Sequence, residues 1–351
     1  MQEKIFCFLW GFGNSEHFLY PSIWIVYQNV LSASDSGTLE QLKELSSKRK
    51  AIEESFNGTS CVTDAIAREI SGGLTSHCEQ DIQKLEQYLP LLENLVRHVK
   101  MKGKNHQMIC WISNLRIRWS SVLTSSSMFH IKDIVQSAAL FRKAAGVYNY
   151  LAQEVLIYLI QAEDRPPEAT CRMSSILSLI CLAEAQAITA RKAEESGKTG
   201  GLLAKLHYGV TEFLIEAIDV LRVTTKECKA ISSRLLDYIL SCKTLHELKC
   251  YKYIAEGLQN NGKIGVAVGV LRQALANAKK SMPKEESWRS VFKMVVDDAS
   301  VQLRKYEHEN EFIWRERVPC NDELPLPEAV KFVTLIPYQP QKWERSLVFK
   351  L

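Results

Sequence analysis

Apolar residues recur every three or four positions along most of this chain, and this spacing predicts helices. Thr38 is placed to cap the first of them, whose apolar positions share one face: Leu39, Leu42, Leu45, Ile52 and Phe56. Shorter helices are expected over 64–70 and 78–99, and Pro90 should bend the second of these. Residues 108–119 fit either a helix or a strand.

The helices predicted after residue 130 are longer, and the first of them is apolar on several sides and should be largely buried. They are expected over 132–162, 174–195, 202–223, 226–258, 263–278 and 285–308. Asn260, Asn261 and Gly262 predict a turn between the fourth and the fifth. The sequence shows no alternation of strands and helices, which argues against a doubly wound enzyme fold. Antiparallel helix pairs with short turns instead predict an all-helical solenoid.

The last part of the chain differs in composition. Five of the ten prolines lie after residue 318, so this stretch cannot form a regular helix. Disordered tails lack large apolar residues, yet this one contains many: Phe332, Val333, Leu335, Ile336, Tyr338 and Trp343. We therefore expect an extended C-terminal tail that packs on the helices.

Residues 1–31 form an atypical N-terminal segment. Its two apolar stretches, 5–11 and 18–26, are each shorter than the roughly 18 residues that span a bilayer. No small-residue cleavage site typical of a signal peptide follows them. A chain of 351 residues can hold two domains, but extended helical arrays reach this length as one body. We expect a single helical domain over 32–345.

Composition narrows the class of protein. With 46% hydrophobic and 24% charged residues the chain is typical of globular proteins, and its net charge of +4 gives no case for nucleic acid as a partner. None of the ten cysteines forms a CxxC pair. They are interpreted as reduced, mostly buried thiols of a cytoplasmic protein, with no metal site.

The sequence offers little catalytic chemistry, so no enzyme activity and no cofactor are expected. It lacks the nucleophile-elbow, phosphate-loop, dinucleotide and zinc-protease motifs. Gly200 and Gly201 fit a tight turn better than a phosphate loop. Glu184 lies in a helix that is otherwise apolar. A lone glutamate of this kind more often pairs with a neighbouring helix or faces outward than acts as a general acid. His207 has no second ligand at metal-binding spacing and is interpreted as structural.

A short basic segment precedes residue 105. Arg97, Lys100, Lys102 and Lys104 could contact an anionic lipid surface or an acidic partner. A solvated loop is the more common role of a short run of charges and remains the favoured interpretation.

Several strings resemble one family, in the same order along the chain. ALFRKAAGVYNYLAQEVL (139–156), LSLICLAEAQAITARKA (177–193), GLLAKLHYGV (201–210) and NEFIWRERVP (310–319) are similar to conserved strings of the BRO-one domain of ALIX-like endosomal adaptors. LRIRWSS (115–121) is similar to the segment before the central helices. The strongest likeness is to stand-alone BRO-like proteins of plants. The resemblance covers about 32–340.

The resemblance implies a boomerang-shaped, tetratricopeptide-like helical domain with no catalytic activity. It also implies an adaptor in multivesicular body sorting, cytoplasmic and peripherally associated with endosomal membranes. The implied partner is the C-terminal amphipathic helix of a Snf-seven/CHMP-type ESCRT-III subunit, held in an apolar groove. A helical-repeat scaffold for another peptide, or for an acidic lipid or protein, is the alternative.

The family's partner-binding residues correspond to Thr189, Leu202 and Leu206 of this sequence. Leu202 and Leu206 are four residues apart and therefore lie on one helix face, although two such leucines can equally face the core. Thr189 replaces a large aromatic anchor of the family, which predicts weaker binding or another partner. The family also has a longer insertion near 120–131, so one internal helix is expected to be missing here.

Overall fold

The computed structural model describes residues 33–57, seven positions between 84 and 95, residues 134–155, 170–227, 233–284 and 286–339, and residue 348. All structural statements below concern these residues. The chain divides into two compact units, residues 12–129 with 338–351 and residues 1–11 with 130–337. We describe each unit by itself.

In the first of these units, helix α3 (Ser36–Asn57) confirms the predicted helix but begins with a different cap. The Asp35 Oδ1 atom accepts a hydrogen bond from the Thr38 amide at 2.6 Å, so Asp35 carries the cap and the prediction of Thr38 was wrong. The Thr38 hydroxyl instead accepts the Val348 amide at 3.0 Å. Leu42 and Leu45 are buried as predicted, whereas Leu39 is exposed.

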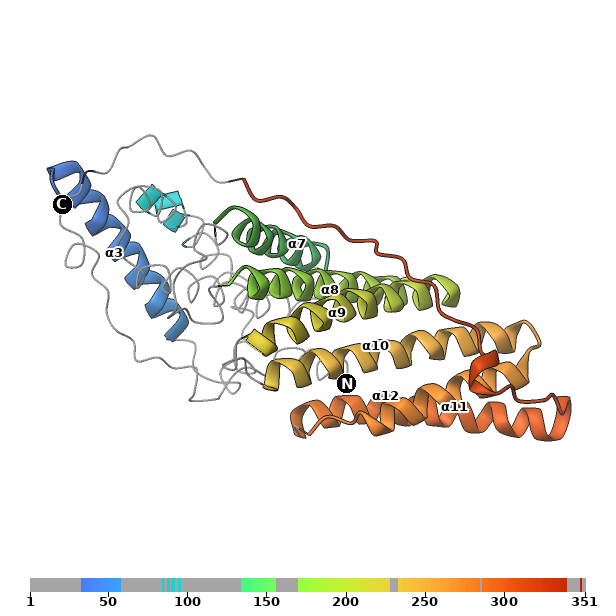
Figure 1. Cartoon of the computed structure of the whole chain (residues 1–351). Coiled ribbons are helices and arrows are strands. Elements are labelled where there is room, and N and C mark those ends of the chain that lie inside the picture. The colour runs from blue at the N-terminus through green and yellow to red at the C-terminus, as the bar shows by residue number, and fades with distance from the viewer. Residues whose placement is uncertain are drawn as a thin grey trace. The chain divides into compact units, whose positions relative to one another are not determined.

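The other unit is a row of helices that follow one another in the sequence (Figure 1). They are α7 (Ile134–Tyr150) with a π-helical end (Leu151–Val155), α8 (Cys171–Glu195), α9 (Gly200–Glu227), α10 (Ser233–Asn260), α11 (Ile264–Lys280) and α12 (Glu286–Glu309). Each helix packs against the next one in the chain, and α10 also contacts α12. Packing between sequence neighbours is typical of helical repeats and confirms the all-helical prediction.

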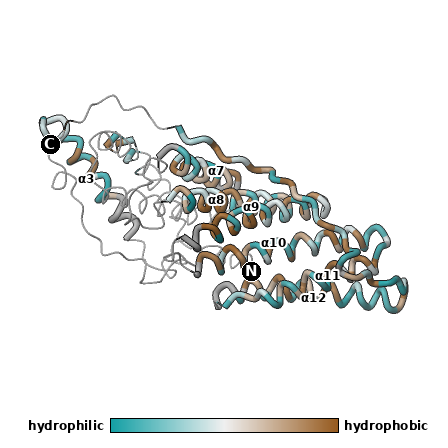
Figure 2. The backbone as a smooth tube through the Cα atoms, viewed as in Figure 1, coloured by the Kyte–Doolittle hydropathy of each residue, from teal (hydrophilic) through white to brown (hydrophobic). Residues whose placement is uncertain are grey.

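The core of this unit runs along α8 and α9, where Figure 2 shows many apolar positions. Helix α8 is buried on nearly all of its sides. Its own buried residues include Ile176, Ile180, Ala185 and Ile188. Among the described helices, α8 alone is long and apolar enough to cross a membrane, but 78% of its apolar window is buried inside the structure. A helix that is apolar on all sides and buried by its neighbours is typical of the core of a helical protein.

Several predicted boundaries shift by a few residues. Gly262, at φ +73°, makes the predicted turn between α10 and α11. The first long helix was predicted through residue 162, but α7 gives way to a π turn at Leu151, and 156–169 lie outside the described residues. The prediction that a new helix starts at Lys226 was wrong, because α9 continues to Glu227.

After α12 the chain forms a π-helical turn (Asn310–Trp314), a short 3₁₀ helix (Asn321–Glu323) and then an extended segment. Residues 324–337 of that segment, which we call the C-terminal strap, run back along the helices toward α7 (Figure 1). The predicted extended tail packed on the helices is thus confirmed for the strap.

Candidate partner-binding surface

One glutamine side chain holds the strap against the helices. Gln186 of α8 is fully buried, and its Nε2 donates to the carbonyls of Leu206, at 3.2 Å, and Val330, at 2.7 Å. Its Oε1 accepts the amides of Phe332, at 3.0 Å, and Val333, at 3.2 Å. All four hydrogen-bonding positions of the amide are filled. Gln186 therefore joins α8, α9 and the strap at one point.

Further hydrogen bonds to the backbone attach the strap to α9 and to α7. The Val330 amide donates to the Lys205 carbonyl at 3.2 Å, and the Ile336 amide donates to the Arg142 carbonyl at 3.0 Å. The Arg142 guanidinium also donates to the carbonyl of Thr334 at 2.7 Å. The strap is thus fixed to α7 as well as to α9, which orders a segment that has no regular structure of its own.

Glycine at position 209 lets the strap approach α9 closely. A Cβ atom there would lie 2.4 Å from the Val330 carbonyl oxygen and 2.7 Å from the Gln186 Nε2 atom. No other residue fits without moving the strap. One turn further, Lys331 pairs with Glu216 and places its ammonium over the Phe213 ring.

Leu202 lies on the side of α9 that carries the strap. Leu202, Lys205, Gly209, Phe213 and Glu216 recur at intervals of three and four residues and therefore share one side of the helix. The last four contact the strap, and Lys205 does so through a 2.7 Å ion pair with the strap's Glu328 as well. Leu202 precedes them by one turn and is 40% exposed.

The other two predicted partner-binding residues differ from Leu202. Leu206 is 3% exposed and lies where Gln186 reaches α9, so it packs in the core, as the alternative interpretation of these leucines predicts. Thr189 is partly buried, and its hydroxyl donates to the Ala185 carbonyl of its own helix at 2.8 Å. It follows Gln186 by three residues and so lies near the strap side of α8. Arg97, Lys100, Lys102 and Lys104 lie outside the described residues.

The strap adds exposed apolar side chains that were not predicted from the sequence as part of the partner-binding surface. Leu326 is 89% exposed, Phe332 is 69% exposed and Val330 is also exposed. Large apolar residues gathered at a surface commonly mark an interaction site. We group them with Leu202, on the same side of α9 as the strap, under the name strap surface: Leu202, Leu326, Val330 and Phe332. The sequence feature that could have indicated these residues is the presence of large apolar side chains in a proline-rich stretch.

A second exposed apolar group lies on the loop after α12. Phe312, Ile313 and Trp314 are exposed. Asn310 closes the loop by donating to the Glu316 carbonyl at 3.0 Å and accepting the Glu316 amide at 2.9 Å. The loop therefore holds its three apolar side chains on a fixed turn.

Two buried polar residues have partners in neighbouring helices. Burial raises the pKa of Glu184 to about 7, and its carboxyl group accepts a hydrogen bond from Tyr238 of α10 at 2.7 Å. This is the structural pairing that the sequence allowed for Glu184. His207 contacts His246 and Glu194, in agreement with its structural interpretation. The described part of the chain contains no group of three or more histidine, cysteine or acidic side chains that could hold a metal ion.

Comparisons with known proteins identify relatives of this chain. The BRO1-like domain matches residues 97–350. The pH-response regulator protein palA/RIM20 of Saccharomyces cerevisiae is 25% identical over 231 residues, which are 64% of this chain and 32% of the yeast protein. The BRO1 domain-containing protein BROX of Homo sapiens is 25% identical over 211 residues, 56% of this chain and 51% of the human protein. The chain thus matches a third to a half of their lengths.

Solved structures share the fold. The ALIX BRO1 domain in complex with CHMP4C has a TM-score of 0.63 at 14% identity, covering 90% of this chain and 92% of its own. ALIX in complex with the SIVmac239 PYKEVTEDL late domain has a TM-score of 0.65 at 15% identity, covering 87% of this chain and 45% of ALIX. At these identities the likeness shows the fold alone.

Proposed function

The chain belongs to the BRO1-like domain family, and on this premise we propose that it is a non-catalytic adaptor of endosomal sorting. We propose as its partner the C-terminal amphipathic helix of a CHMP-type ESCRT-III subunit. The observation that carries the proposal is the exposure of Leu202 on the strap side of α9, the position that the family resemblance assigns to the partner. The structural relative solved with CHMP4C supports the same class of partner.

The strap surface has the chemistry that such a helix needs. An amphipathic helix presents apolar side chains at intervals of three and four residues, and exposed aliphatic and aromatic groups can receive them. Leu202 and Phe332 supply one such group from α9 and one from the strap, and Gln186 fixes the strap position that presents Phe332. We therefore assign recognition to both elements and place Leu206 beneath them in the core.

Thr189 makes the proposed affinity lower than that of relatives with an aromatic residue at this position. Its hydroxyl is bonded within α8, so it offers a partner only a small apolar surface. Loss of an aromatic anchor costs roughly 2 kcal/mol or more of binding free energy. This substitution also favours the second candidate function, a helical scaffold for a different peptide with a smaller apolar face.

We further propose that the protein is cytoplasmic and associates peripherally with endosomal membranes through its partners. The basic residues Arg97, Lys100, Lys102 and Lys104 are proposed as an additional contact to an anionic lipid surface.

Binding of fluorescent ESCRT-III C-terminal peptides tests the proposal. Leu202→Asp places a charge in the apolar surface and is expected to weaken binding at least roughly tenfold, which corresponds to about 1.4 kcal/mol. Val223→Asp, an exposed apolar position at the other end of α9, is the matched control and should leave the affinity unchanged. Circular dichroism checks that both variants fold. Equal affinity of Leu202→Asp and the unmodified chain would show that this surface is not the binding site.

A further inference from the structure

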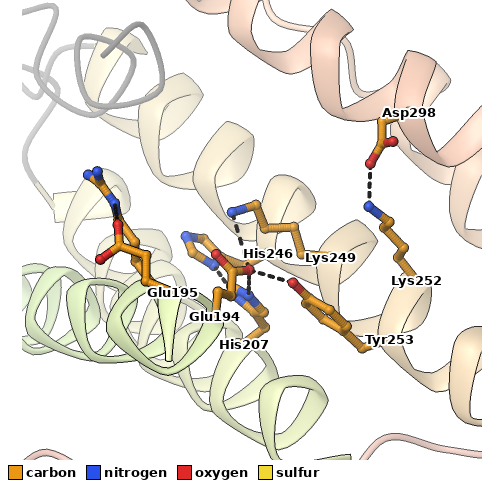
Figure 3. Close-up of polar contacts among 9 residues, drawn as sticks. Glu194, Glu195, His207, His246, Lys249, Lys252, Tyr253 and Asp298 are labelled. Atoms are coloured by element: carbon orange, nitrogen blue, oxygen red, sulfur yellow. Dashed lines mark hydrogen bonds and ion pairs between the residues drawn. The ribbon is translucent and has the colours of Figure 1, made fainter. Parts of the chain in front are cut away.

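Four polar side chains from α9 and α10 gather near the carboxylate of Glu194, which lies on α8 (Figure 3). Glu194 lies in the last turn of α8, His207 in the second turn of α9, and His246, Lys249 and Tyr253 lie on α10. One oxygen of Glu194 accepts hydrogen bonds from the His207 Nε2 atom, at 2.8 Å, and the Tyr253 hydroxyl, at 2.9 Å. The Lys249 ammonium lies 3.9 Å from the same oxygen. This group, which we call the histidine latch, connects α8, α9 and α10.

The hydrogen-bonding partners of the two histidines determine which ring nitrogen carries a hydrogen. Because ionised Glu194 can only accept, His207 must carry its hydrogen on Nε2. A neutral His207 then has a lone pair on Nδ1, which lies 3.0 Å from Nδ1 of His246. His246 must therefore donate from its Nδ1 atom. The space between the two rings holds a single proton.

Burial and the charge of Lys249 oppose a second proton on the histidine pair. Burial lowers the pKa of His207 and lowers that of His246 further, while the neighbouring Glu194 acts in the opposite direction on both. Burial alone would raise the pKa of Glu194, but hydrogen bonds from His207 and Tyr253 and the charge of Lys249 lower it to about 2. The carboxylate therefore stays ionised in the folded chain over the whole range in which histidines titrate.

The charges facing the latch come from α8, α10 and α12. Burial lowers the pKa of Lys249, and the positive charges of Lys252 on α10 and Arg191 on α8 lower it as well, whereas Glu194 raises it. Lys252 is itself paired with Asp298 of α12, and Arg191 is paired with Glu195 at 3.0 Å. Lys249 carries the positive charge that acts on both imidazoles, and it disfavours their protonation.

We propose that the histidine latch is an acid-sensitive device that holds α8, α9 and α10 together near neutral pH and loosens as the pH falls. A proton added to Nδ1 of His207 would face the N–H group of His246 across 3.0 Å, so the rings must separate to accept it. In an opened latch both rings regain the ordinary histidine pKa of 6.5. The open state then binds more protons than the closed state below that pH, and acid favours opening.

Opening of the latch would act on the start of α9. The first two turns of this helix carry Leu202 and Lys205 as well as His207. Loss of the His207 contacts would therefore free the part of α9 that borders the strap surface. The effect on partner binding rests on the proposed function, whereas the opening itself does not.

Amide hydrogen–deuterium exchange of the full chain without any partner tests the latch. After correction for the intrinsic pH dependence of exchange, protection of residues 200–210 and 243–253 should fall roughly tenfold between pH 7 and pH 5.5 for each proton taken up. Protection of α11, which contributes no group to the latch, should stay constant. Constant protection of all these segments across the same range would overturn the proposal.

Variants separate the latch from a general effect of acid. His246→Phe keeps a ring but removes one of the two proton sites, so the change in protection should shrink from roughly a hundredfold to roughly tenfold. His308→Gln, outside the latch, should keep the full change. Exchange of the histidine Cε1 hydrogens in the unmodified chain gives each ring's protonation even where His246→Phe fails to fold. If His207 and His246 both protonate at pH 6.5 or above without loss of amide protection, the latch is not acid-sensitive.

Discussion

Two polar clusters connect α8 to α9 by different chemistry. At Gln186 a neutral amide makes four hydrogen bonds to backbone groups, none of which titrates. Eight residues further along α8, Glu194 contacts the imidazole of His207, an ammonium and a phenol, and His207 in turn contacts the imidazole of His246. The comparison teaches that one helix can use both kinds of contact, one made of groups that do not titrate and one made of groups that can. The strap is held by the first cluster, and the second joins α8, α9 and α10.

The largest loss of stability is expected from removing the side-chain amide of Gln186. Gln186→Ala leaves two amides and two carbonyls without their partner, and each buried unsatisfied group costs about 1–3 kcal/mol. Because water reaches the detached strap and satisfies some of them, we expect the free energy of unfolding to fall by roughly 3 kcal/mol. Urea denaturation measures this loss, and exchange of the strap amides shows its detachment.

The pH dependence of this variant sharpens the comparison between the clusters. The loss caused by Gln186→Ala should be the same at pH 7.5 and pH 5.5, because the amide and its partners do not titrate. Gln273→Ala, at a partly exposed position on α11, should change stability little. If the loss of stability caused by Gln186→Ala varied with pH as strongly as opening of the latch, the two clusters would not differ in their pH dependence.

A smaller effect is expected from adding one methyl group under the strap. In Gly209→Ala the new Cβ meets the Val330 carbonyl at 2.4 Å, so the strap must shift, at a cost of about 1–3 kcal/mol. Gly257→Ala on α10 is the matched control, since nothing lies within 4 Å of its Cβ, and it should stabilise the chain by up to about 1 kcal/mol. Thermal denaturation of both variants gives the comparison. Equal stabilisation by both substitutions would show that the strap does not pack closely on α9.

Much of the fold follows from local patterns in the sequence. The apolar period of α8, α9, α11 and α12 predicts those helices to within a few residues, because each is amphipathic or fully apolar. The cap of α3 was predicted at the wrong residue, since Asp35 and Thr38 are both good capping residues and the sequence gives only their types. Local pattern therefore predicts which segments are helical better than where they begin.

The candidate site could not be predicted to the same degree, because distant contacts decide it. Leu202 and Leu206 have the same pattern in the sequence, yet only Leu206 is buried, where Gln186 and the strap meet α9. The Gln186 contact with Val330 spans 144 residues, and the contact of His207 with His246 spans 39. No local period encodes such pairs. The family resemblance pointed to α8 and α9, and tertiary packing determines which of their side chains are exposed.

The central claim is that the strap side of α9 receives the partner helix. The most direct measurement is the exchange footprint of a bound CHMP-type C-terminal peptide at pH 7.5. We expect increased protection confined to residues 186–206 and 326–333, with α11 and α12 unchanged. Protection that appears on the 310–317 loop instead, with none at Leu202 or in the strap, would contradict the claim.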